Sequence, residues 1–536
     1  MERGKWRLID YTTEDVSGTL VFSSGDGPAE PIVLPIGQEG WHAIHIGFPH
    51  GIGWGFPTLK LTDDPCFTPI VKDPPPCWGP QMWEGFWKVA DLTGQDLTIR
   101  AMPGSRDSVR SPHAQPCLAY VRLVALTDDQ IAARQADVAD PSHKKLIFMC
   151  DGYGVAEQVG SGRGVEAVLQ MMEPARDTDF GTLLFQLNSP FGSAPYKSRH
   201  LEMMGDGDDL LPEAAHPRLV VNGYRTMADS GTDMLDFVLK HAKAMGLKAW
   251  VGCRWMNTVN APYDEHWITR FAADHPEYWC RDREGHRVSA ISMAYEEVRQ
   301  FAALTFSEVL RRGADGLAIL FVRSGPWLVY EEPVMRAFQE STGLDALELD
   351  EGDPRWVDFK CDLVTQYMWE IRAILDEEAA RRGVDRLPFA VEVHANEENN
   401  RYWALDIARW AAEGIVDVVI AKDQVHVAGA PDYEFPVDFE YFKQAVRGTA
   451  CKLYKDVMPR SMPPDEYRAK AREAYDHGCD GLSFWDTDDR FALNQWEVIR
   501  RLGHPDELTK TSTVKYRKII SMNGIHVDRY NVWWVY

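Results

Sequence analysis

The chain has 536 residues, 45% of them hydrophobic and 26% charged, which is typical of a globular protein with a large core. Its 57 basic and 81 acidic residues give a formal net charge of −24, which repels phosphate backbones and anionic lipid surfaces. These values argue against nucleic acid and membranes as partners, and no apolar run approaches the roughly 18 residues of a membrane span.

Two features bear on the cellular compartment. The first residues, MERGKWRLIDYTTED, contain no apolar segment of the kind found in signal peptides. The nine cysteines include no C-x-x-C pair, and only Cys66 and Cys77 lie close enough to suggest a bridge. We expect reduced thiols and a cytoplasmic protein, or a secreted one if a leader has been removed. The sequence carries no sign of oligomeric state, so a homo-oligomer is left as one of the alternatives.

Residues 1–130 have the pattern of an antiparallel β-sandwich. Short alternating runs such as GTLVFSS, TLKLTDD and LAYVRLVAL are separated by Gly, Pro and Asp clusters. Residues 131–143 form a polar linker. At the other end of the chain, residues 506–536 suggest a C-terminal β extension that packs on the sandwich or on the domain between them.

Residues 144–505 alternate buried β runs with amphipathic helical runs, which indicates a parallel α/β fold. Eight strands are expected, at 145–152, 181–188, 247–255, 316–323, 389–396, 416–423, 450–456 and 480–488. Eight strand–helix pairs predict a (β/α)8 TIM barrel, with an open doubly wound sheet as the alternative.

In such a barrel, side chains at the carboxyl ends of the strands surround the active site. The expected strand ends carry a polar ring of Asp151, Asn188, Arg254, Arg323, Glu392 with His394, Asp423, Lys455 with Asp456, and Asp486 with Asp488. Each aspartate taken alone also has a structural explanation, because aspartate often caps the helix that follows.

Glu392 stands out within this ring because it lies inside the apolar run FAVEVHAN. Side chains alternate along a strand, so Glu392 and His394 share one face and the neighbouring valines take the other. Burial raises the pKa of a carboxyl group, which suits a general acid. The structural alternative is an ion pair with an arginine across the barrel.

Glycoside hydrolysis uses two carboxyl groups, so Glu392 needs a partner. Asp423, Asp486 and Asp151 are the candidate second catalytic residues. The predicted substrate-binding residues are Arg323 and Arg254, which can clamp a carboxylate, the tryptophans Trp255 and Trp485, which can stack on sugar rings, and His394 and Lys455. No H-E-x-x-H, Walker loop, G-x-S-x-G or zinc-spaced cysteine motif is present, so we expect no cofactor and no metal.

Two segments resemble glycosyl-hydrolase-like family 10. They are HPEYWCRDREGHRVSAISMAYEEVRQFAALTFSEVLRRGADGLAILFVRSGP and YWALDIARWAAEGIVDVVI, and the resemblance covers about 145–505. It implies a TIM barrel related to the α-amylase type, in which a strand-four aspartate is the nucleophile and a strand-five glutamate the acid/base. Glu392 matches that glutamate and Arg323 the strand-four arginine. Leu320 stands at the aspartate position, which argues against a retaining mechanism of the amylase type. More weakly, the front sandwich resembles accessory domains of bacterial carbohydrate-active enzymes.

The resulting hypothesis is a glycoside hydrolase that acts on an oligo- or polysaccharide, with Glu392 as general acid/base. It is inverting if Asp423, Asp486 or Asp151 activates a water, and retaining if a nucleophile comes from another strand. One alternative is a carbohydrate-binding barrel without catalysis. Another is a metal-dependent isomerase or lyase that uses Glu392, His394 and aspartates.

Overall fold

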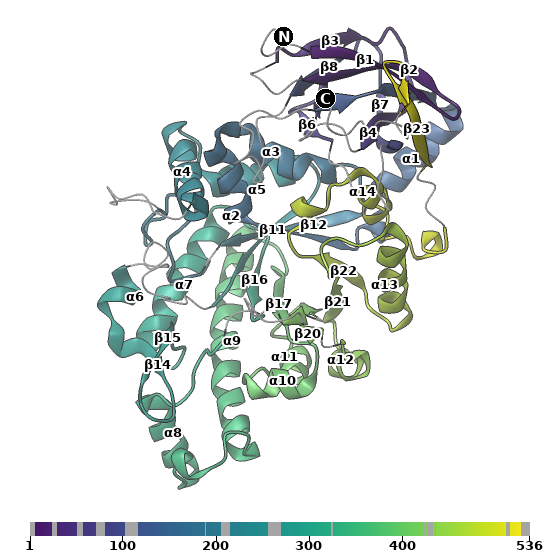
Figure 1. The fold of residues 1–536 in the computed structure, drawn as a ribbon. Helices are drawn as coiled ribbons and strands as arrows, with labels where there is room; N and C mark the ends of the chain where they lie inside the picture. The colour runs from purple at the N-terminus through teal and green to yellow at the C-terminus, as the bar shows by residue number, and fades with distance from the viewer. Residues whose placement is uncertain are drawn as a thin grey trace.

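The computed structural model describes residues 6–23, 29–50, 57–70, 81–101, 116–187, 189–204, 215–255, 270–322, 325–422, 424–425, 433–434, 436–510 and 515–526. Figure 1 shows an all-β unit at one end of the molecule and an α/β barrel below it. The first and the last strands of the chain lie together in the all-β unit (Figure 1).

Two antiparallel sheets make up this unit. One has the order β10-β4-β7-β23-β1-β2-β9, with β24 paired to β23, and the other has the order β3-β8-β5-β6. Ile44 and Trp83 of the first sheet share one core with Leu59 and Ile99 of the second, which confirms the sandwich. The strands are β1 (Trp6–Thr13), β2 (Ser17–Ser23), β3 (Ile32–Pro35), β4 (Trp41–His50), β5 (Pro57–Leu61), β6 (Thr68–Pro69), β7 (Gln81–Asp91), β8 (Asp96–Ala101), β9 (Cys117–Leu118), β10 (Tyr120–Ala125), β23 (Lys515–Met522) and β24 (Ile525–His526).

The C-terminal strand β23 lies between β1 and β7, pairing with both. The tail therefore packs on the sandwich, and it joins two strands from the beginning of the chain into one sheet. Cys77, the residue that could bridge to Cys66, lies outside the described ranges. The eight described cysteines, Cys66 among them, are all buried, and no disulfide joins any of them to another described cysteine.

A closed parallel barrel follows, and this closure excludes the open doubly wound sheet. Its strands are β11 (Leu146–Asp151), β12 (Phe180–Leu187), β13 (Lys248–Cys253), β16 (Gly316–Leu320), β17 (Phe389–Val393), β18 (Val418–Ala421), β21 (Lys452–Asp456) and β22 (Gly481–Phe484). β22 pairs with β11 to complete the circle. Each of the eight strands begins within two residues of its predicted start, but β16 and β17 end three residues and β22 four residues before the predicted end.

Helices surround the barrel (Figure 1). They are α2 (Gly152–Gln158), α3 (Glu166–Met172), α4 (Ala215–Asp229), α5 (Met234–Ala244), α6 (Arg270–Asp274), α7 (Glu296–Arg311), α8 (Glu332–Thr342), α9 (Pro354–Arg382), α10 (Glu397–Tyr402), α11 (Ile407–Ala412), α12 (Phe439–Val446), α13 (Pro464–Asp476) and α14 (Leu493–Ile499). Two small hairpins are inserted, β14 (Trp279–Arg281) with β15 (Arg287–Ile291) and β19 (Gln424–Val425) with β20 (Tyr433–Glu434). No helix among the described residues has the length and apolar character needed to cross a membrane.

The longest helix shows how the sequence sets these boundaries. The carboxylate of Asp353 accepts a hydrogen bond from the backbone of Arg355 at the start of α9, where Pro354 occupies the first turn. Gly383 ends the helix with φ 69°, a left-handed conformation that glycine adopts without a steric penalty.

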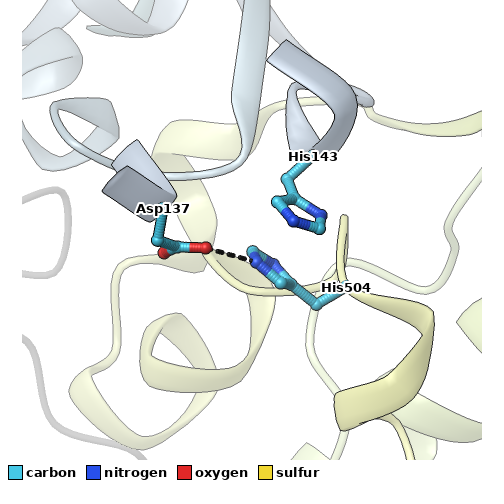
Figure 2. Close-up of side chains that lie close together, drawn as sticks. All are labelled: Asp137, His143 and His504. Carbon is cyan, nitrogen blue, oxygen red and sulfur yellow. Dashed lines mark hydrogen bonds and ion pairs between the residues drawn. The ribbon is translucent and has the colours of Figure 1, made fainter. Parts of the chain in front are cut away.

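The linker helix α1 (Asp128–Ala139) contacts the segment after α14 through Asp137 and His504 (Figure 2). His504 lies between two carboxylates, with Nδ1 2.7 Å from Asp179 and Nε2 2.7 Å from Asp137. The ring of His143 stacks on it at 3.7 Å between centroids. Asp137 belongs to α1 and Asp179 directly precedes β12, so the side chain of His504 contacts the linker helix and the barrel at once.

His504→Ala is expected to lower the free energy of unfolding by about 1–3 kcal/mol, because it removes the side-chain hydrogen bonds of two carboxyl groups and leaves the buried Asp179 with only the more distant Arg501 as a side-chain partner. Urea unfolding monitored by circular dichroism measures the change. His286→Ala is the matched control, since that histidine is exposed and belongs to a surface turn. Equal stabilities of the two variants would contradict the role assigned to His504.

Candidate active site

Residues of the barrel strands alternate between two apolar cores. One core lies inside the barrel and includes Ile147, Leu184, Leu320 and Ile420. The other lies between strands and helices and includes the intervening residues of the same strands. This period of two identifies which side chains at the strand ends point inward. The inward set at the carboxyl ends is Asp151, Gln186, Arg254, Leu320, Glu392, Lys422, Asp456 and Trp485.

Glu392 is fully buried on β17, in register with Leu320 and Ile420. Burial is the main cause that raises the pKa of this carboxyl to about 8, and the nearby Asp456 adds to the rise. Lys422 and Arg254 oppose it. Oε2 of Glu392 has no hydrogen-bond partner among the described residues. The raised pKa therefore favours the protonated form of Glu392 at neutral pH.

Lys422 joins Glu392 to Asp456. Its Nζ lies 2.7 Å from Asp456 Oδ2 and 3.4 Å from Glu392 Oε1. The other oxygen of Asp456 accepts a hydrogen bond from the backbone N–H of Trp485 at 3.0 Å. The cation thus pairs mainly with Asp456, which is consistent with a neutral Glu392. The two carboxyl oxygens that share Lys422 lie no more than about 6 Å apart.

A second ion pair lies beside the first. Arg254 donates to Asp151 at 3.0 Å and to Gln186 at 3.1 Å. The ring of Trp485 connects the two pairs, because Lys422 Nζ lies 4.1 Å and Arg254 Cζ 5.1 Å from its centroid. Each cation is matched by a carboxylate, so the charges in this part of the barrel balance only while Glu392 stays protonated.

His394 and Asp486 are held close to this group. The backbone of His394 exchanges two hydrogen bonds with the side chain of Asn400 from α10. Burial lowers the pKa of His394 to about 4, so its ring is neutral, and Nδ1 has no partner among the described residues. Asp486 adopts a left-handed conformation with φ 47° and forms an ion pair with Arg460. A non-glycine residue in this conformation costs about 1–3 kcal/mol and often marks a functional site.

Two predicted substrate-binding residues point away from the barrel interior. Lys455 shares the outer face of β21 with Leu453, because its neighbour Asp456 points inward. Trp255 packs in the outer core against Phe191 and Tyr367. The prediction that either one contacts a ligand in the barrel is therefore wrong. Asp423 and Arg323, two further predicted site residues, lie outside the described ranges.

The sequence analysis missed Lys422 altogether and gave Asp456 no role in the site. Both are visible in the alternation once Glu392 is placed inward. In VVIAKD the residues that point into the barrel are Val418, Ile420 and Lys422. Asp423 follows Lys422 directly, so the alternation does not assign it to the inward face. In KLYKD the inward position beyond Tyr454 is Asp456 and not Lys455. A shift of one residue on a strand moves a side chain to the opposite face.

Among the residues that the structure describes, two groups of side chains have ligand atoms close enough to hold a metal ion. Asp137, His143 and His504 are one, but the stacked rings differ by 17° in plane and both nitrogens of His504 contact carboxylates (Figure 2). Lone pairs of stacked rings run side by side and do not converge on one ion. The other group, at residues 282–286, is a surface turn. Neither group includes Glu392 or His394.

Comparisons with known proteins place this geometry in context. The family model described as Glycosyl hydrolase-like 10 matches residues 196–467, about half of the chain. No curated protein sequence matches. Similar solved structures include the glycoside hydrolase domain of PgaB from Bordetella bronchiseptica, with 12% identity, a TM-score of 0.41, and coverage of 67% of this chain and 98% of that one. An α-galactosidase from Thermus thermophilus has 10% identity, a TM-score of 0.34 and coverage of 94% and 95%. A family GH18 chitinase from Cycas revoluta has 10% identity and a TM-score of 0.36, with coverage of 67% of this chain and 99% of that one.

Proposed function

The chain belongs to the glycosyl hydrolase-like 10 family, and from this premise we propose that it hydrolyses glycosidic bonds of an oligo- or polysaccharide with Glu392 as general acid. The observation that carries the proposal is the state of Glu392. It is a buried, protonated carboxyl whose Oε2 has no acceptor among the described residues. A glycosidic oxygen would supply that acceptor.

In the proposed reaction, the O–H of Glu392 donates its proton to the glycosidic oxygen as the bond from that oxygen to the anomeric carbon breaks. A water attacks the anomeric carbon from the opposite face and gives its proton to a second carboxylate. Glu392 has no exposed surface, so the side chains that cover it must move when a glycan binds.

We assign the second carboxylate to Asp151. Asp456 is fully buried, and its two oxygens bind Lys422 and the backbone of Trp485, so it positions the lysine. Asp486 is engaged by Arg460. The oxygens of Asp151 also accept hydrogen bonds, from Arg254 and from the backbone N–H of Tyr153, but its side chain stays 23% exposed and can meet a water. This assignment makes the enzyme inverting, and proton NMR of the first product formed reports the anomeric configuration. Retention would move the assignment to another carboxylate.

A glycan-binding barrel without catalysis is the second candidate, and Leu320 favours it. This leucine is buried in register with Glu392, at the position where the family resemblance places a nucleophile. A screen of neutral and acidic polysaccharides for new reducing ends separates the two functions. Hydrolysis that disappears in Glu392→Gln supports the enzyme, whereas saturable binding without any product supports the binding protein.

The pH dependence of hydrolysis follows from the raised pKa of Glu392. A general acid works in its protonated form, so we expect kcat/KM to fall about tenfold per pH unit above roughly pH 8. Initial rates between pH 5 and about pH 10 on the glycan found in the screen measure this limb. A rate that falls already above the ordinary glutamate pKa would contradict a protonated Glu392 at neutral pH.

A further inference from the structure

A cavity of about 780 Å3 lies at the opposite end of the barrel from Glu392. It is bordered by α1, α13, α14, the segment that follows α14, and Phe86 of β7. The backbone carbonyl of Arg500 binds the N–H of Asp179 just before β12 begins, which places the cavity at the amino ends of the strands. Its size is typical of pockets that bind small molecules.

Arg500 lines this cavity as a buried cation that forms no ion pair among the described residues, although the carboxylates of Glu497, Asp177 and Asp179 lie near enough to interact with it electrostatically. The residue is 7% exposed, and its guanidinium forms no hydrogen bond or ion pair with the part of the chain that the structure describes. Its nearest aromatic contact is Phe86, with Cζ 5.2 Å from the ring centroid. Burial lowers the pKa of Arg500 to about 10, yet the side chain stays charged at neutral pH. The N–H donors of this guanidinium are therefore available to a ligand that enters the cavity.

The other cations around the cavity already have partners. Arg134 pairs with Asp177, Arg468 with Asp465, and Lys510 with Glu507. Arg501 binds both Asp137 and Glu507. Only one positive charge in the described wall is therefore left for a ligand.

We propose that this cavity is a binding site for a hydroxylated monocarboxylate, namely an acidic sugar such as a uronic acid. The planar guanidinium of Arg500 binds the carboxylate through two parallel hydrogen bonds. Glu497 also lines the cavity and lacks a hydrogen bond or ion pair among the described residues, so it accepts hydrogen bonds from sugar hydroxyls.

The charges of the wall favour a carboxylate over a phosphate. The guanidinium of Arg500 neutralises one negative charge, while Glu497 and Asp506, which form no ion pair among the described residues, repel a second one. The proposal goes beyond the hydrolase function and does not depend on it, because no residue of the cavity belongs to the Glu392 group.

Thermal unfolding with sodium glucuronate tests the proposal, with glucose, sodium acetate and inorganic phosphate as comparison probes. Glucuronate is expected to raise the Tm of the full chain more than any of the other three. Arg500→Met should abolish the response to glucuronate, because it removes the guanidinium that binds the carboxylate. Arg336→Met, on the exposed face of α8, is the control and should respond as the wild type does.

Calorimetric titration gives the second readout. Arg500→Lys keeps the charge but loses the two-point contact, so the Kd for glucuronate should rise at least about tenfold. Glu497→Gln should weaken glucuronate and leave acetate unchanged. A wild-type response to glucuronate no greater than that to acetate would overturn the proposal. So would an Arg500→Met protein that responds normally, and a larger response to phosphate would overturn the ligand class.

Discussion

Glu392→Gln is expected to lower kcat by roughly a hundredfold to ten-thousandfold and to change KM little. The amide has nearly the shape of the carboxylic acid and fits the same buried space on β17, but it has no acidic proton for the leaving oxygen. Steady-state rates on the glycan identified by the screen give both constants.

Glu331→Gln is the matched control for this variant. Glu331 is also fully buried, and burial raises its pKa, but it accepts backbone hydrogen bonds from Arg281 and Val329 outside the barrel. This change should reduce stability and leave kcat unaltered. If Glu392→Gln turned over substrate at the rate of the control, Glu392 would have no catalytic role.

Lys422→Met is expected to lower the free energy of unfolding by about 3–5 kcal/mol. The change removes the cation from between two buried carboxyl groups and leaves Asp456 ionised without a counter-charge. The added substitution Asp456→Asn should recover much of the loss, since it removes the orphaned charge. Urea unfolding of the single and double variants measures this coupling.

Lys452→Met provides the control for that series. Lys452 lies on the same sheet, at the start of β21, but it is 60% exposed in its pair with Asp480. An exposed pair contributes about 0–1 kcal/mol, so this variant should stay near wild-type stability. Equal losses in the two lysine variants would show that Lys422 carries no buried charge pair.

The fold was predictable from the sequence because its signals are local. Each of the eight barrel strands is a short apolar run that ends at polar residues, and period-two runs marked the sandwich. Closure through β22 and β11 and the insertion of β23 between β1 and β7 depend on pairing between distant segments. Local pattern does not encode such pairing, so the sequence left both arrangements open.

The site was only partly predictable, for a different reason. Glu392 was recognisable because a carboxyl within an apolar strand is unusual, and its buried position follows from that. At the other strands, the choice between two adjacent polar residues depends on which of them points into the barrel. In the sequence this alternation was assigned only around Glu392. Asp456 and Lys422 lie one residue from Lys455 and Asp423, the residues that the sequence analysis chose.

The central claim is that the barrel holds Glu392 as a protonated acid at neutral pH. Infrared difference spectroscopy of wild type against Glu392→Gln tests it most directly, because it detects the carbonyl stretch of a protonated carboxyl without knowledge of the substrate. The structure predicts a carboxylic acid band at pH 7 that is absent in the variant and is lost as the pH rises through about 8. A spectrum at pH 7 in which Glu392 contributes only a carboxylate band would contradict the account.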